Sequence, residues 1–147
     1  TERLIKAYPE WHFEPLKGLN RVQLSEKLYQ AKLYIDFGHH PGRDRMPREA
    51  AMHGCCLITG KLGSAGNTVD LPIPPQYKLD SNTNGFVEQF GLLAADITGD
   101  FPKHFAVFEP YRKWLQDEPR VFKEQIQKIF HQNIKNAEHK WLSTALK

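Results

Sequence analysis

Residues 32–59 read KLYIDFGHHPGRDRMPREAAMHGCCLIT, and this stretch decides the fold. It begins and ends with short apolar-rich runs, KLYIDF at 32–37 and CCLIT at 55–59, and each run predicts a strand. CCLIT shows no polar alternation, which is typical of a parallel strand buried on both faces. Residues 47–53 predict a helix between the strands, because proline fits the first helical position and Gly54 can end the helix. The stretch therefore predicts a β–α–β unit.

The flanking segments extend this prediction to the whole chain. Residues 11–16 are rich in aromatic side chains and predict a further strand. Leu24, Leu28 and Ala31 share one face of a predicted helix. From Gly85 onward the pattern is helical only. The expected fold class is therefore α/β, a Rossmann-like parallel sheet covered by helices, with an all-helical C-terminal part.

We expect one domain, complete or the latter part of one, with an α/β core at residues 1–80 and a helical closing segment at 81–147. Three prolines at 102, 110 and 119 are expected near helix starts. The longest C-terminal helix is expected to carry an apolar face made of Phe122, Ile126 and Ile129.

Composition excludes several classes of protein. Of the 147 residues, 40% are hydrophobic and 25% are charged, values typical of a globular domain. The net charge of +3 is too small to indicate a nucleic-acid partner. No run reaches the roughly 20 apolar residues of a membrane span. Cys55 and Cys56 are adjacent and are read as small buried residues, so a reducing compartment, the cytoplasm, is expected.

Two loops are expected to lie at the functional edge of the sheet. Residues 39–45 and residues 60–67 each follow a predicted strand, and ligands bind outside the carboxyl ends of parallel strands. The first loop leads into a helix N-terminus, where free N–H groups favour an anion. The second loop, GKLGSAGN, has glycines that allow the backbone to approach a ligand closely. The pattern predicts a site for a phosphate-bearing ligand.

Four motifs follow one another here: DFG at 36–38, HPG at 40–42, PREAA at 47–51 and GCCLI at 54–58. Together they resemble the C-terminal, donor-binding domain of retaining GT-B glycosyltransferases, over roughly residues 11–80. Glu49 matches the second glutamate of that family's paired-glutamate motif, and Gly42 and Gly54 match its glycines. Pro41 stands where the first glutamate belongs. The family's two opening strands, its basic pair and its N-terminal acceptor domain have no counterpart before Trp11.

The resemblance implies a donor- and phosphate-binding set and names no catalytic residue. This set is His40, Gly42, Arg43, Arg45, Arg48, Glu49, Lys61, Gly63 and Ser64. Glu49 would accept hydrogen bonds from the ribose hydroxyls, with a helix-start acid as the alternative. The arginines would hold a diphosphate, or else form solvated ion pairs. His39 and His40 are adjacent without a third ligand at zinc spacing, so no metal and no cofactor are expected.

The function expected is donor nucleotide-sugar binding, as the C-terminal part of a glycosyltransferase. Two alternatives stay open: a non-catalytic dimerisation or interaction module derived from that fold, and a nucleotide-sugar epimerase. The expected partners are a nucleotide sugar, an N-terminal acceptor domain or upstream strands, and a second copy in a homodimer. We expect the isolated chain to transfer no sugar, because the acceptor side of the cleft is absent.

Overall fold

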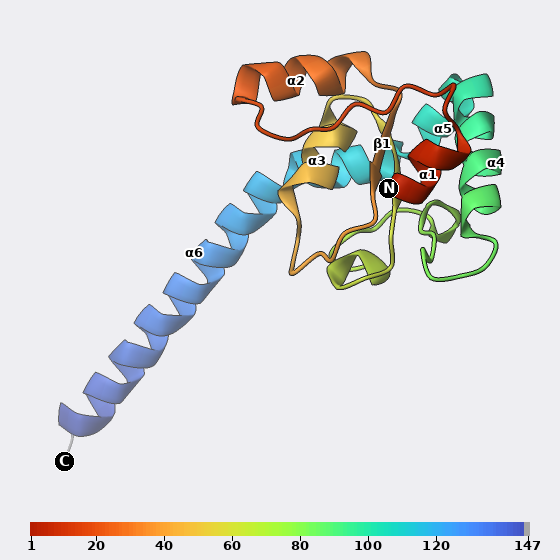
Figure 1. Cartoon of the computed structure of the whole chain (residues 1–147). Helices are drawn as coiled ribbons and strands as arrows, with labels where there is room; N and C mark the ends of the chain where they lie inside the picture. Colours follow the sequence, from red (N-terminus) through yellow and green to blue (C-terminus); the bar gives the residue numbers. More distant parts are fainter. Residues whose placement is uncertain (146–147) are drawn as a thin grey trace. The chain divides into compact units, whose positions relative to one another are not determined.

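The computed structural model describes the backbone of residues 1–145 and the side chains of residues 1–131 (Figure 1). The end of the expected helical segment, residues 146–147, lies outside the described part. The chain divides into two compact units, residues 1–112 and residues 113–147. The first unit contains the sheet and both predicted loops.

The predicted β–α–β unit is confirmed. Strand β1 (Leu33–Asp36) is followed by helix α3 (Arg45–Met52) and strand β2 (Cys56–Thr59). The strands pair in parallel from Leu33 opposite Cys56 to Asp36 opposite Thr59. All four residues of β2 are buried, as the unbroken apolar run predicts. The helix ends at Met52, and Gly54 then takes a φ of +93°, which favours glycine.

The expected Rossmann-like sheet is wrong, because the sheet has only two strands in the part of the chain that the structure describes. Residues 11–16 form no strand. Trp11 stacks on Tyr8 with ring centroids 4.5 Å apart and contacts the Phe90 ring at 6.0 Å. Its half-buried ring thus packs against Tyr8 and Phe90 instead of a sheet, and Pro15 brings no N–H group to a ladder.

One further segment touches the sheet edge. Lys78 forms an isolated parallel bridge with Thr59, and the Leu79 N–H donates to the Thr59 carbonyl at 2.8 Å. This contact extends the sheet beyond β2 by one bridge only. A two-stranded sheet needs covering elements to be stable. In this unit, α3 contacts both strands and helix α4 (Phe86–Gly99) contacts β1.

The N-terminal helices follow the sequence pattern. Helix α1 (Glu2–Ala7) ends before Pro9, and helix α2 (Arg21–Gln30) buries Leu24 and Leu28. Asn20 begins α2 with a capping box, in which its side chain accepts from the Gln23 N–H and the Gln23 side chain accepts in return. The helix predicted from its apolar face is therefore confirmed.

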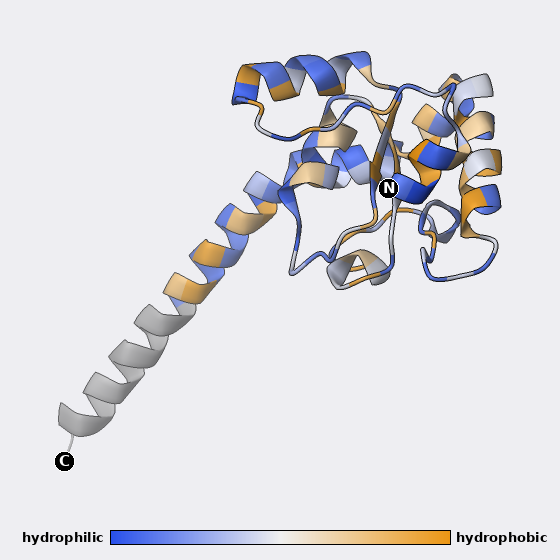
Figure 2. Ribbon diagram, viewed as in Figure 1, coloured by the Kyte–Doolittle hydropathy of each residue, from blue (hydrophilic) through white to orange (hydrophobic). Residues whose placement is uncertain are grey.

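Further helices follow two short 3-10 turns, η1 (Ser64–Gly66) and η2 (Pro75–Tyr77). They are α4, α5 (Phe101–Val107) and α6 (Glu109–Ala145). Pro102 and Pro110 lie in first turns, whereas the expectation for Pro119 is wrong, because Pro119 lies inside α6. Figure 2 shows apolar residues recurring along the described part of α6. No helix among the described residues combines the length and hydropathy of a membrane span.

A chain of hydrogen bonds connects η2, α5 and α4. The Tyr77 hydroxyl lies 2.7 Å from His104 Nδ1, and His104 Nε2 lies 2.9 Å from an Asp96 carboxylate oxygen. Because the carboxylate can only accept, Nε2 carries the proton and Nδ1 accepts from the tyrosine. Each nitrogen of the His104 ring therefore has one hydrogen-bond partner. The bond to Tyr77 fixes the segment that leads to Lys78.

We expect Cys55 and Cys56 to be unreactive toward a disulfide reagent in the folded protein at about pH 8. Both thiols are free and fully buried, and burial raises the pKa of Cys55 to about 12 and that of Cys56 to about 11. Only the thiolate attacks a disulfide. The amount of thiol that reacts with the reagent should be negligible until denaturant is added. It should then reach two equivalents per chain. Rapid reaction of the folded chain would contradict the buried position of CCLIT.

Candidate functional site

The loops that follow β1 and β2 are joined through their backbones. His40 and Gly63 form a parallel bridge, and the Ser64 N–H donates to the His40 carbonyl at 2.9 Å. The Ser64 hydroxyl also donates to the Gly42 carbonyl. The expectation that the first loop (residues 39–45) and the second loop (residues 60–67) lie side by side is therefore confirmed.

Gly63 is required where the two loops meet. Its φ is +64°, and a Cβ atom at this position would lie 2.1 Å from the His40 carbonyl oxygen. Both the backbone conformation and the close approach exclude a side chain. Gly42, on the other loop, is not in the left-handed region, and a Cβ atom there would meet no other atom within 4 Å. Position 42 can therefore accept a side chain, whereas position 63 cannot.

Lys78 fixes the far end of the second loop, which sequence reasoning missed. Its side chain is buried, and Nζ donates to the carbonyl of Asn67 at 2.6 Å and to that of Leu71 at 2.8 Å. Desolvation lowers the pKa of this ammonium group. A lysine between Tyr77 and Leu79 gives no sequence signal that its charge is used internally, because most lysines are solvated.

The predicted cationic residues lie on both loops and at the start of α3. Arg43 Nε lies 3.4 Å from an Asp70 carboxylate oxygen, and Arg45 Nε lies 3.1 Å from Glu49 Oε1. The side chains of Arg43 and Arg45 are exposed, and so is Lys61 of the second loop. Exposed ion pairs are weak, about 0–1 kcal/mol, so an anion can compete for these guanidinium groups.

The N-terminus of α3 is already capped by a carboxylate. Asp44 is the N-cap, and its side chain accepts from the Met46 N–H at 3.4 Å. The helix consequently begins at Arg45, and the expectation that Pro47 occupies its first position is wrong. Arg48 lies in the first turn and is half-buried. Asp44 takes the place that an anionic ligand would otherwise have at the helix end.

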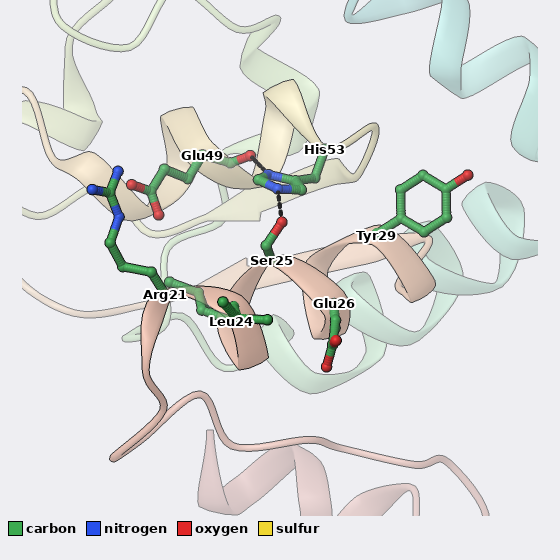
Figure 3. A pocket seen from close by; sticks show the side chains of 8 residues that line it. Arg21, Leu24, Ser25, Glu26, Tyr29, Glu49 and His53 are labelled. Atoms are coloured by element: carbon green, nitrogen blue, oxygen red, sulfur yellow. Dashed lines mark hydrogen bonds between the residues drawn. The ribbon is translucent and has the colours of Figure 1, made fainter.

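Glu49 borders a pocket of about 560 Å³ between α2 and α3 (Figure 3). Its carboxylate and the Arg21 guanidinium lie close to one another in this view, and Tyr29 lies at the other end of the pocket. The residues that line the pocket are Arg21, Val22, Leu24, Ser25, Glu26, Tyr29, Glu49 and His53. The pocket therefore combines an acceptor carboxylate, a cation and an exposed aromatic ring.

A histidine at the floor of this pocket connects α2 to α3. His53 Nδ1 lies 2.8 Å from the Glu49 carbonyl oxygen, and Nε2 lies 2.7 Å from Ser25 Oγ. The carbonyl can only accept, so Nδ1 donates to it and Nε2 accepts from the serine hydroxyl. This arrangement fixes the distance between the helices that frame Glu49.

His40 is the most buried residue of the predicted set that carries an ionisable side chain. This side chain is 2% exposed, with Nε2 3.5 Å from an Asp36 oxygen and Nδ1 3.6 Å from an Asp44 oxygen. Sequence reasoning missed the grouping of these three residues, although they recur at intervals of four. The ring is therefore turned away from solvent and toward carboxylates.

The structure thus brings together His40, Gly42, Gly63 and Ser64, with Lys61 on the same second loop. Glu49 faces the α2–α3 pocket, and its ion pair with Arg45 connects the pocket to the start of α3. No protein-family model, curated protein or solved structure matches the chain. Its function must therefore be argued from these residues.

We expect Gly63→Ala to destabilise the fold by about 2 kcal/mol or more, because the added methyl group meets the His40 carbonyl in a strained backbone conformation. Gly42→Ala is the matched control and should change the free energy of unfolding by less than about 0.5 kcal/mol. Urea denaturation of the two variants measures both values. Equal stability of the two would show that the loops do not meet at Gly63.

Proposed function

We propose that the chain binds the diphosphate of a nucleotide-sugar donor at the two joined loops, as part of a glycosyltransferase. The observation that carries the proposal is the backbone junction of the loops at His40 and Gly63. Because of this junction, the arginines of the first loop and Lys61 of the second loop belong to the same edge of the sheet, where β1 and β2 end. Exposed arginine and lysine side chains on two joined loops are suited to a diphosphate, which spreads its charge over several oxygens.

The pocket beside Glu49 supports a place for the nucleoside. A carboxylate can accept hydrogen bonds from both hydroxyls of a ribose diol. Glu49 is half-buried at the pocket rim, and Tyr29 offers an exposed ring that a base could cover. The Arg45–Glu49 pair connects this carboxylate to the loop cations, so ribose and diphosphate would bind to consecutive parts of one surface.

The chemistry proposed is departure of a nucleoside diphosphate from the sugar. Preorganised cations stabilise the negative charge that develops on the leaving phosphate oxygen. We assign that role to Arg43, Arg45 and Lys61, and assign the acceptor to a separate N-terminal domain of the kind the resemblance implies. The chain alone would then bind donor without transferring sugar. We further place the protein in the cytoplasm, where two buried free thiols remain reduced.

One observation favours a second candidate, an interaction module. The part of α6 within residues 113–131 exposes large apolar side chains, among them Phe122 at 66% and Phe130 at 61%. The apolar face expected for this helix is therefore present but lies open to solvent. Exposed apolar surface of this kind is typical of protein–protein contacts. Under this alternative the loops would bind no nucleotide.

Glu49→Gln should weaken the binding of a nucleoside diphosphate roughly ten- to hundred-fold, since a hydrogen bond to a charged group contributes about 1.5–3 kcal/mol. It should not weaken the binding of pyrophosphate, because loss of the carboxylate releases Arg45 from its ion pair. Lys61→Ala should weaken both ligands alike. Isothermal titration of pyrophosphate and of a panel of nucleoside diphosphates into each variant measures these effects.

Glu88→Gln is the matched control, because Glu88 is an exposed glutamate on α4 and does not line the pocket beside Glu49. It should leave the affinity of both ligands unchanged. Equal losses for both ligands in Glu49→Gln would remove the ribose assignment. Absence of nucleoside diphosphate binding by the native chain would remove the proposed function and favour the interaction module.

A further inference from the structure

A cluster of two aspartates and one histidine lies at the end of β1 and in the loop that follows it. Asp36 is the last residue of β1, and His40 and Asp44 follow it at intervals of four in the first loop. Each of the three offers one ligand atom, and these atoms all lie within 4.8 Å of one another. Two carboxylates and an imidazole so close together are the donor set of many transition-metal sites.

The imidazole of His40 points to a ligand independently of the acidic residues. The side chain is almost fully buried, and its Nε2 has no hydrogen-bond partner. The 3.5 Å separation between Nε2 and Asp36 Oδ2 is too long for a well-formed hydrogen bond. A buried ring nitrogen without a partner costs free energy, which a bound cation would recover.

Both carboxylates are oriented by groups outside the cluster. Asp36 accepts from the Tyr34 hydroxyl at 3.0 Å and from the Gly38 N–H at 2.9 Å, while Asp44 accepts from the Met46 N–H. The His40 backbone is held in turn by its bridge to Gly63. Metal ligands are commonly fixed by such surrounding hydrogen bonds, which leave a lone pair directed at the ion.

We propose that Asp36, His40 and Asp44 bind one divalent transition-metal ion of the Zn²⁺ or Mn²⁺ type. Each residue supplies one atom: a carboxylate oxygen from Asp36 and Asp44, and one ring nitrogen from His40. The two carboxylates balance the charge of the ion. Ligand bonds of about 2.0–2.2 Å require the three ligand atoms, which lie within 4.8 Å of one another, to move closer together when the ion binds. The imidazole favours these ions over Mg²⁺ and Ca²⁺, which prefer oxygen.

This inference deepens the proposed function without depending on its test. A cation at the cluster would lie in the same loop as Arg43 and could share the charge of a diphosphate. The sequence offered only His39 as a companion for His40, and the structure supplies Asp36 and Asp44 instead. Binding of the metal alone needs no nucleotide, so either proposal can fail while the other stands.

The test is titration of Zn²⁺ and, separately, Mn²⁺ into the full chain after treatment with a chelator and its removal. The native chain should bind about one equivalent, and Asp36→Asn and His40→Ala should each weaken binding about ten-fold or more. His39→Ala is the matched control, because His39 is the exposed neighbour in the same loop. Its affinity for the metal should equal that of the native chain.

If His40→Ala does not fold, Asp44→Asn tests the metal site instead. Asparagine keeps the size of the side chain and the N-cap of α3 but removes the negative charge. Circular dichroism establishes that each variant is folded. Failure of the native chain to bind either ion would overturn the proposal. So would a loss in His39→Ala equal to that in Asp36→Asn, or binding of Mg²⁺ as tight as that of Zn²⁺ and unchanged by His40→Ala.

Discussion

The backbone contact between His40 and Gly63 joins the two loops that carry most of the candidate side chains. The chain leaves both parallel strands at the same edge of the sheet. The pairing of the strands does not by itself hold the two long loops together. The bridge does so with main-chain atoms, so loop geometry does not depend on flexible side chains. The close approach and positive φ at this contact explain the glycine at position 63 of the second loop. Lys78 completes the constraint by holding the end of that loop from inside.

The β–α–β unit could be predicted because its signals are local. A continuous apolar run, a glycine after a helix and a proline in a first turn each reflect the backbone of a few neighbouring residues. The extent of the sheet could not be predicted in this way. Trp11 and its neighbours have the composition of a strand, but pairing depends on partners distant in sequence, and here Tyr8 and Phe90 bury that surface.

The same division applies to the site. The neighbouring positions of the two loops follow from the rule for parallel strands, which needs only the order of elements. The ion pairs of Arg43 and Arg45 with Asp70 and Glu49 could not be derived, because they depend on side-chain directions. His40 was included among the candidates as a loop residue. Its burial between two carboxylates required the fold, although the spacing of four was visible in the sequence.

The electrostatics of the strand-end edge give the two proposals a common physical basis. Exposed guanidinium groups lie on the outer side of the first loop, while the buried imidazole and two carboxylates lie behind them. Asp44 already accepts from the Met46 N–H in the first turn of α3, so that helix end cannot serve as a bare anion site. An anion at this edge must therefore rely on side-chain cations. A metal ion held by Asp36, His40 and Asp44 would change the balance, because it would neutralise the two carboxylates that lie next to the proposed diphosphate position.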